Sequence, residues 1–406
     1  MTRRPRAARW VIAIGVVTAV AGGSARATSL ADRLHQFIDR NGFPTSGEFN
    51  EAVTPIVERL ALRGIDLPAT ATTPAFTYEF DFETGVPTRT SQSLGPTFVE
   101  RAETVGRHRF AIGVSHLYAD LDKFDGHDFA DDIVTAGVRS LGNIQIGGAF
   151  VADDFSLETH VTDVSATFGV TAAWDVNVLV PITQTSLAVD GTSAVIAERD
   201  GVQSEIRAHV GFEDGAVGLG DVLVRTKLRV VDAELARVAL ALGIRTPSGS
   251  AKDFHGLGDT IVTPSVIVSR AFGRHDVHLN LGVDCNADDL ERTRARYAAG
   301  ASIQPWERLA FLLDVIGSSS FTDDEFSFPA AVGSIKQLFG NDALVRSVTR
   351  DSVTAFVPRS DVVDLAFGVK VNPVGTLVGY VTAIVPLTRD GLRAEVIPSA
   401  GVEWSF

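Results

Sequence analysis

The chain has 406 residues, of which 45 % are hydrophobic and 21 % are charged, and its net charge is −14. Its single cysteine, Cys285, excludes an internal disulfide, a thiol redox pair and a zinc site of several cysteines. The acidic balance disfavours nucleic acid and anionic phospholipid as partners, so we expect no nucleic-acid binding.

The first 27 residues read as basic, then apolar, then small. Arginines precede the apolar run 10–21, and Ala25-Arg26-Ala27 has the small-x-small form of a cleavage site. The apolar run is shorter than the ~20 residues that a membrane-spanning helix needs. We therefore predict a secretory signal peptide over residues 1–27, which is removed after export through the inner membrane.

Residues 28–106 combine helical and extended patterns. Apolar residues at helical spacing occur over 30–38 and again over 49–60, whereas those of 76–82 alternate as in a short strand. Pieces of this size cannot bury a core alone, so we expect a periplasmic or plug-like N-terminal segment that docks on a larger body.

From residue 107 onward, apolar and polar residues alternate with a period of two, which predicts strands. Each predicted strand has about 10 to 15 residues, a length that suits a tilted strand crossing a bilayer. The twelve predicted strands cover 108–119, 156–170, 173–187, 220–231, 236–246, 259–271, 275–284, 293–303, 307–317, 362–371, 376–386 and 394–406.

The connections between these strands alternate between short turns and long loops. The long ones cover 120–155, 188–219, 247–258, 285–292, 318–361 and 387–393. Short turns on the periplasmic side and long loops outside are typical of outer-membrane barrels. We therefore predict an all-β fold: residues 107–406 form a transmembrane antiparallel up-and-down β-barrel of about twelve strands. The apolar set then faces lipid and the polar set faces the lumen, the reverse of a soluble barrel.

The last predicted strand ends on "AEVIPSAGVEWSF", with large apolar residues at every second position. The pattern Ser399-x-Gly401-x-x-Trp404-x-Phe406 resembles the C-terminal signal that the outer-membrane assembly machinery recognises. A closed barrel leaves no strand edge open in lipid, so such a strand needs no polar tail. We therefore expect location in the cell outer membrane of a Gram-negative envelope. The expected partners are the barrel assembly machinery, outer-membrane lipid and lipopolysaccharide.

Four stretches resemble an outer-membrane barrel family named after the meta-pathway of phenol degradation. They are "GPTFVERAETVGRHRFAIGVSHLYADLDKFDG" (95–126), "GLGDVLVRTKLRV" (218–230), "ALALGIRTPSGSAKDFHGLGD" (239–259) and "DGLRAEVIPSAGVEWSF" (390–406). The resemblance covers residues 95–406 and implies the barrel architecture and a transport role for small organic solutes, aromatic ones included. It implies no catalytic residues and no cofactor.

Ionisable residues on the polar faces of the strands are the candidates for lining a pore. Opposed basic and acidic walls would orient polar or anionic solutes, whereas charges that pair with one another would only stiffen a narrow barrel. Both alternatives stay open at this point. The candidates are Arg225, Lys227, Arg229, Arg237, Arg245, Asp276, His278, Asp284, Arg294, Arg296, Arg308, Asp314, Asp364, Glu395 and Glu403.

Other motifs favour no enzyme and no metal or cofactor site. The two Gly-Leu-Gly-Asp sequences at 218–221 and 256–259 lack the Lys-Ser/Thr of a phosphate loop. His275 and His278 fall on opposite faces of one strand and cannot share a metal. His278 has acidic and amide neighbours, but no nucleophile stands out beside it, so we expect no catalysis.

We therefore predict a porin-like outer-membrane channel that passes small organic solutes passively through a charged lumen. The alternatives are a structural or adhesive barrel with a closed lumen and, as a weaker candidate, a lipid-modifying enzyme embedded in the barrel.

Overall fold

The barrel wall is one antiparallel sheet that closes on itself. The computed structural model describes residues 28–41, 67–81, 86–89, 93–124, 126–128, 134–141, 144–199, 202–233, 235–322, 324–329, 345–348, 352–357 and 359–406. Within these residues twelve strands follow one another around the barrel, and the last pairs with the first. They are β3 (Phe110–Phe124), β6 (Ile144–Gly169), β7 (Trp174–Arg199), β9 (Leu223–Asp232), β10 (Arg237–Arg245), β11 (Ile261–Phe272), β12 (His275–Asn286), β13 (Arg294–Trp306), β14 (Leu309–Ser320), β18 (Asp361–Val374), β19 (Leu377–Pro386) and β21 (Ile397–Ser405).

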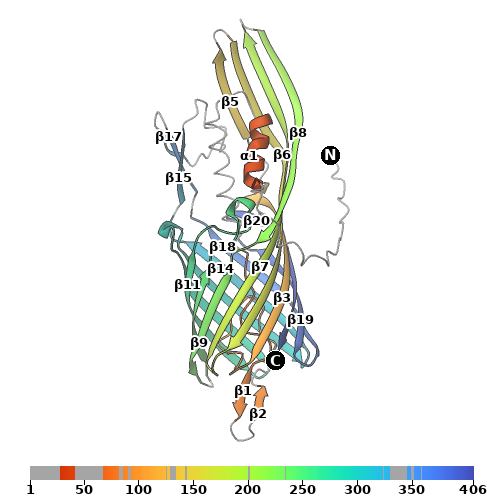
Figure 1. The fold of residues 1–406 in the computed structure, drawn as a ribbon, viewed down its shortest axis with the longest axis vertical. Coiled ribbons are helices and arrows are strands. Elements are labelled where there is room, and N and C mark those ends of the chain that lie inside the picture. Colours follow the sequence, from red (N-terminus) through yellow and green to blue (C-terminus); the bar gives the residue numbers. More distant parts are fainter. Residues whose placement is uncertain are drawn as a thin grey trace.

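All twelve strands coincide with predicted ones, which confirms the all-β up-and-down barrel. The short turns, such as 273–274 and 375–376, lie at the end of the barrel that also carries the C-terminus (Figure 1). Gly273 and Gly375 occupy these two turns with φ of 64° and 55°, a left-handed conformation that favours glycine. We call this the short-turn end and the opposite one the long-loop end.

The two faces of the wall differ in chemistry as predicted. On β10 the side chains of Leu240, Leu242 and Ile244 point outward and are 39–48 % exposed, whereas Ala239 is buried. On the inner face even a lysine, Lys227, is only 3 % exposed. An apolar outer band around a polar interior is the arrangement that a transmembrane barrel requires, because lipid cannot hydrogen-bond to polar groups. No helix within the described ranges is long and apolar enough to cross a membrane.

The wall extends beyond the barrel at the long-loop end, where the sequence predicted loops. β6 and β7 each run for 26 residues, and β5 (Val134–Leu141) and β8 (Val202–Leu219) pair with their upper parts (Figure 1). The predicted loops 120–155 and 188–219 were therefore wrong for most of their length. A sheet that leaves the bilayer need not be apolar on one face, so the alternation that marks a wall strand fades there.

Short elements decorate both ends of the barrel. Its long-loop end carries β4 (His127–Asp128), β15 (Asp324–Pro329), β16 (Val345–Val348), β17 (Ser352–Val357), β20 (Leu392–Ala394) and the 3-10 turns η2 (Ala251–Asp253) and η3 (Leu290–Arg292). A hairpin of β1 (Tyr78–Asp81) and β2 (Val86–Arg89) extends beyond the short-turn end (Figure 1).

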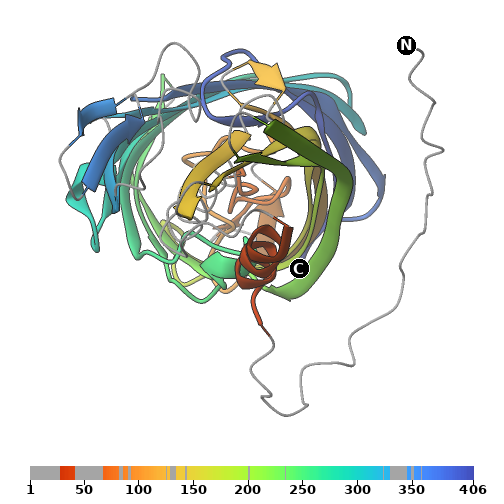
Figure 2. The ribbon, with the colours of Figure 1, turned by 90° about the horizontal axis from the view of Figure 1, so that it is seen from above.

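Part of the N-terminal segment runs along the inside of the barrel. It begins as α1 (Leu30–Asn41) at the long-loop end, which confirms the first predicted helix, while the second one, over 49–60, falls outside the described residues. Residues 67–77 and 93–106 then lie inside the ring of strands, seen from above in Figure 2. We call these two stretches the plug.

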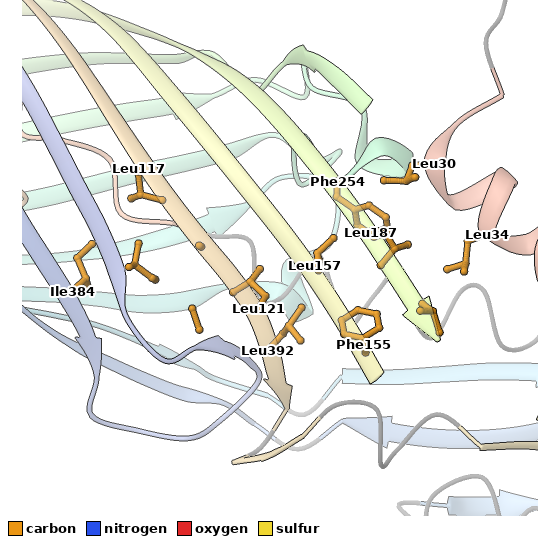
Figure 3. Close-up of a cluster of buried hydrophobic side chains, with 14 of the residues drawn as sticks. Leu30, Leu34, Leu117, Leu121, Phe155, Leu157, Leu187, Phe254, Ile384 and Leu392 are labelled. Atoms are coloured by element: carbon orange, nitrogen blue, oxygen red, sulfur yellow. The ribbon is translucent and has the colours of Figure 1, made fainter. Parts of the chain in front are cut away.

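Buried apolar side chains close the long-loop end. Leu117 and Leu121 of β3, Leu157 of β6 and Leu187 of β7 pack together with Phe254 of the loop after β10 (Figure 3). Leu30 and Leu34 of α1 join this group, which we call the mouth cluster, and so does Phe98 from the plug. Burial of these groups away from water holds α1, the plug and the wall together at this end.

α1 is fixed over the mouth by polar contacts as well. The Leu30 amide donates to Asp253 Oδ1 at 2.7 Å, and Arg33 Nη2 donates to the Gly215 carbonyl at 3.0 Å. Arg33 also pairs with Asp214 at 3.2 Å. The helix therefore spans from the loop after β10 to the extended strand β8.

Candidate functional site: the filled lumen

The wall holds the plug through the backbone of the plug. Asn280 on β12 accepts from the Glu100 amide at 2.7 Å and donates to the Glu100 carbonyl at 2.9 Å. Ser269 on β11 accepts from the Ala102 amide at 2.8 Å. A buried backbone that forms neither helix nor sheet must find such partners, because each orphaned polar group costs free energy.

Two wall carboxylates serve the same purpose. Asp314 Oδ2 accepts from the amides of Thr97 and Phe98 at 3.2 and 3.1 Å. Asp175 Oδ2 accepts from the amide of Val105 at 2.9 Å. Asp314 is thus placed in the lumen, but it faces the plug rather than an open pore.

Two lysines of the wall donate hydrogen bonds to carbonyl groups of the plug. Lys227 Nζ donates to the Arg101 carbonyl at 2.9 Å and also to the Thr73 hydroxyl. Lys370, on the opposite side of the barrel, donates to the Pro96 carbonyl at 2.8 Å and pairs with Glu403 at 3.2 Å. The two buried lysines therefore satisfy backbone carbonyl groups of the plug from opposite sides of the barrel.

Glu100 of the plug lies between two wall cations. Its carboxylate is 3.4 Å from Arg225 Nη1 and 3.6 Å from Lys227 Nζ, and it accepts from the Thr72 amide and hydroxyl at 2.7 Å each. Arg225 in turn donates from Nη1 to the Thr70 carbonyl at 2.8 Å. Both passes of the plug are therefore joined to the same strand, β9.

A second charged group lies nearer the short-turn end. Glu103 of the plug accepts from Arg237 Nη1 at 2.8 Å and lies 3.7 Å from Arg101, which is 2 % exposed. Arg237 and Arg229 both pair with Asp232, at 2.9 and 3.0 Å. Basic residues of β9 and β10 therefore meet acidic partners locally instead of facing an acidic wall across a pore.

The remaining inward charges form short-range pairs near the long-loop end. Asp284 accepts from Arg296 Nε at 2.7 Å and from the Thr263 hydroxyl at 2.6 Å, with Arg294 at 3.7 Å. Asp364 pairs with Arg393 of β20. Arg245 lines a cavity that is described below.

Two predicted lumen residues lie in connections rather than in wall strands. Arg308 is exposed in the 307–308 turn, and Glu395 lies between β20 and β21 with its side chain 84 % exposed, 3.9 Å from Lys123. Alternation assigns a face only while the strand continues, and both residues stand just beyond a strand end. Their assignment to the pore lining therefore stays a prediction.

A serine, a histidine and an aspartate meet on β11 and β12, a group that the sequence did not reveal. His278 Nδ1 lies 2.8 Å from Ser269 Oγ, and His278 Nε2 lies 3.2 Å from Asp276 Oδ1. The signal was available, since Ser269 and His278 stand at equal distances from the 273–274 turn and pair in register. The backbone amide of Ala102 in the plug donates a hydrogen bond to Ser269 Oγ, and the side chains of Ser269, His278 and Asp276 are all buried.

The predicted assembly-signal residues occupy the seam where the barrel closes. Phe110 and Phe406 exchange two backbone hydrogen bonds of 2.9 and 2.8 Å, and the rings of Trp404 and Phe406 lie 5.3 Å apart on the outer face. Ser399 is buried on the inner face, and a Cβ at Gly401 would overlap the Tyr380 ring. Glycine at 401 therefore has a packing reason of its own.

Several of the wall residues that contact the plug were not among the predicted lumen residues, because only ionisable side chains had been selected. Besides Asn280 and Ser269 they include Gln304, which accepts from the Leu94 amide at 2.8 Å, and Thr167, which donates to the Thr72 carbonyl at 2.8 Å. The available signal was a neutral hydrogen-bonding side chain at an inward position of a wall strand. Asp175 and Lys370 carried the charge signal but were not selected.

Cavities remain beside the plug. The larger, of about 170 Å³, lies between the plug and strands β9 to β14 in the long-loop half of the lumen. A smaller one of about 80 Å³ adjoins it near His255 and Asp221, and Arg245 borders both. The lumen is thus filled by the plug at the short-turn end and hollow beneath the mouth cluster.

Three solved structures are among those that are similar to this chain. An outer-membrane channel from Pseudomonas putida F1 is 10 % identical, with 75 % of this chain and 98 % of that chain covered and a TM-score of 0.45. A FadL homologue from Pseudomonas aeruginosa is 10 % identical, with 73 % and 89 % covered and a TM-score of 0.30. The toluene transporter of Ralstonia pickettii is 13 % identical, with 74 % and 89 % covered and a TM-score of 0.24. No curated protein matches this chain.

A family model described as "MetA-pathway of phenol degradation" matches residues 137–381. The match is longer than half of the chain and runs from within β5 into β19. It contains two of the four stretches that carried the resemblance, 218–230 and 239–259. The chain belongs to the MetA-pathway of phenol degradation family.

Proposed function

We propose that this protein is an outer-membrane channel for the passive passage of small organic solutes, and that its plug must shift before a solute can pass. The family description supports a solute connected with aromatic degradation. The N-terminal segment, residues 28–106, then acts as a gate that is built into the chain.

The observation that carries this proposal is the chemistry of the contact between plug and wall. Side chains such as Asn280, Asp314 and Lys227 bind plug backbone groups, which water can also bind. Each hydrogen bond exchanged for water changes the free energy by only about 1 kcal/mol, whereas an apolar core would have to be exposed outright. A plug held in this way can be displaced in steps as water or solute enters.

The two ends of the lumen suit an apolar solute with a polar group. The mouth cluster offers apolar side chains at the long-loop end, and the cavity of about 170 Å³ lies directly beneath it. A solute that enters between α1 and the wall would meet charged groups only after leaving the apolar layer. This order favours amphipathic organic molecules over simple salts.

We assign the Ser269, His278 and Asp276 group to plug anchoring rather than to catalysis. The Ala102 amide bonds the serine oxygen that a nucleophile would need, and none of the cavities described above is lined by these residues. A hydrolase would need a reachable nucleophile. The channel proposal thus includes no enzymatic step.

The competing proposal is a structural barrel whose lumen stays closed. The buried ion pairs between plug and wall favour it, because separating buried charges is costly. The two proposals differ in whether the plug ever leaves its seat.

Conductance in planar bilayers separates them. We expect small, intermittent currents from the mature chain, residues 28–406. Larger currents are expected from Lys227→Met, which removes a cation of β9 that binds the plug. No current from either form would contradict the channel and favour the closed barrel. Wall selectivity is testable in the same system, since Arg225→Ala should lower the preference for anions.

The route to the membrane is part of the proposal. We propose that residues 1–27 direct export and are removed, and that Trp404 and Phe406 at the barrel seam are read by the assembly machinery. Lipopolysaccharide would then surround the extended strands at the long-loop end.

A further inference from the structure

The cavity of about 170 Å³ has one apolar side. Phe98 of the plug faces Leu223, Ile261 and Ile316 of the wall across it. Small residues at inward positions leave the space open, and a Cβ added at Gly243 would meet Thr263, Arg225 and Leu223 only at ordinary contact distance. A cavity of about 150 Å³ accommodates a benzene molecule, so this one has room for a single ring with a small substituent.

The other side of the cavity is rich in cations. Among the described residues that line it, five are cationic and three are carboxylates, in a chain whose net charge is −14. The cations are Arg225, Lys227, Arg245, Arg294 and Arg296, and the carboxylates are Glu100, Asp175 and Asp284.

Each of these carboxylates already has partners. Glu100 is shared by Arg225 and Lys227, and Asp284 is shared by Arg294 and Arg296. Asp175 accepts from the Val105 amide.

Arg225 Nη2 is buried and bonds to no other group in the described part of the chain. Asp163 and Arg245 both line the smaller cavity. A buried N–H group without an acceptor is unfavourable, so Arg225 favours a ligand that brings an acceptor oxygen into the cavity.

We propose that this cavity binds a small organic carboxylate whose apolar body is about the size of one ring. The carboxylate would accept hydrogen bonds from Arg225 and its arginine neighbours, since a guanidinium matches a planar carboxylate with two parallel N–H groups. The ring would lie against Phe98, Ile261 and Ile316. An inorganic anion would leave that apolar side facing water, which is why the body of the ligand matters as much as its charge.

The proposal deepens the channel function and rests on it, because the bound carboxylate would be a solute in transit. It places the ligand beside Glu100, on the plug itself. A bound anion would therefore compete with Glu100 for Arg225 and Lys227 and weaken one of the ties that hold the plug.

The test is titration calorimetry on the full mature chain in detergent, at neutral pH, with benzoate as the probe. Benzyl alcohol keeps the ring and lacks the charge, while acetate keeps the charge and lacks the ring. We expect benzoate to bind about tenfold or more tightly than either. Arg245→Gln should weaken benzoate binding about tenfold, and Arg274→Gln, in an exposed turn, should leave it unchanged.

A second variant keeps the test decisive. Ala298→Phe fills the cavity without changing its charge and should abolish benzoate binding, with heat-modifiable gel migration as the check that the barrel has folded. Equal binding of benzoate and benzyl alcohol, or full binding to folded Ala298→Phe, would overturn the proposal.

Binding and passage are measured separately, so the two proposals fail in different ways. Benzoate bound by a chain that never conducts would remove the channel and keep the site. Conductance without benzoate binding would remove the site and keep the channel.

Discussion

The two halves of the lumen are closed by different forces. At the long-loop end, Leu117, Leu157 and the leucines of α1 exclude water by apolar packing. At the short-turn end, Gln304 and Asp175 hold the plug by hydrogen bonds to its backbone. Apolar closure is insensitive to which apolar solute enters, whereas polar closure depends on keeping every partner in place. If the protein is a channel as proposed, the mouth would select by hydrophobicity and the plug would respond to charge.

The largest expected effect comes from removing a buried cation beneath the plug. Lys227→Met deprives Glu100 and the Arg101 carbonyl of their partner, which should destabilise the seated plug by about 3 to 5 kcal/mol. Hydrogen exchange of the amides of residues 94–106 should rise about a hundredfold or more.

Arg229→Met is the matched control for Lys227→Met. It lies two residues further along the same strand and pairs with Asp232, outside the plug. Equal acceleration of plug exchange in both variants would contradict the specific anchoring.

A cavity at the mouth should weaken the barrel and spare the plug. Leu157→Ala removes a fully buried member of the mouth cluster and should lower the free energy of urea unfolding in detergent by about 2 to 4 kcal/mol. Val164→Ala, on the outer face of the same strand, should cost much less. If Leu157→Ala frees residues 94–106 as strongly as Lys227→Met does, the two halves are not independent.

Undocking α1 is a smaller effect. Arg33 and Asp214 are each about one-third exposed, so water screens their pair, and Arg33→Ala should cost about 1 kcal/mol. Amides of α1 should then exchange roughly fivefold faster, with exposed Gln36→Ala as the control. An unchanged exchange rate would mean that apolar contacts alone hold the helix.

The smallest effect concerns pH at the loop after β10. Burial lowers the pKa of His255 from its ordinary value of 6.5, although the Ala216 carbonyl and Asp253 act in the opposite direction. The opened loop binds a proton more readily than the closed one, so closure loses stability as the pH falls below about 6.5. Exchange of residues 249–257, corrected for intrinsic rates, should be faster at pH 5.5 than at pH 7.5. His255→Gln should remove that difference, and its persistence would rule out the histidine.

The wall could be predicted from the sequence because lipid imposes a simple rule on it. Leu240, Leu242 and Ile244 alternate with small or charged residues since one face meets hydrocarbon and the other does not. Above the bilayer that rule lapses, and β5 and β8 were consequently expected to be loops. The alternation rule also gives no assignment for turn residues such as Arg308.

The partners of the plug were harder to predict for a different reason. The wall binds mainly the backbone of residues 94–105, and a backbone amide leaves no mark in the sequence. Charged inward residues were found, but their partners in the plug and neutral partners such as Asn280 were not. The grouping of Ser269 with His278 required the register across a turn, which alternation alone does not give.

The most direct test of the account is to tie the plug to the wall and measure passage. Ser93 of the plug and Ser302 of β13 have their hydroxyl oxygens 3.0 Å apart, so Ser93→Cys with Ser302→Cys, in a Cys285→Ser background, should form a disulfide on oxidation. The control is Ser320→Cys with Ser360→Cys, a pair 3.4 Å apart that does not involve the plug. Oxidation should stop most solute flux into liposomes in the first pair only, and reductant should restore it. Equal flux through the oxidised and reduced forms of the first pair would contradict a gate formed by the plug.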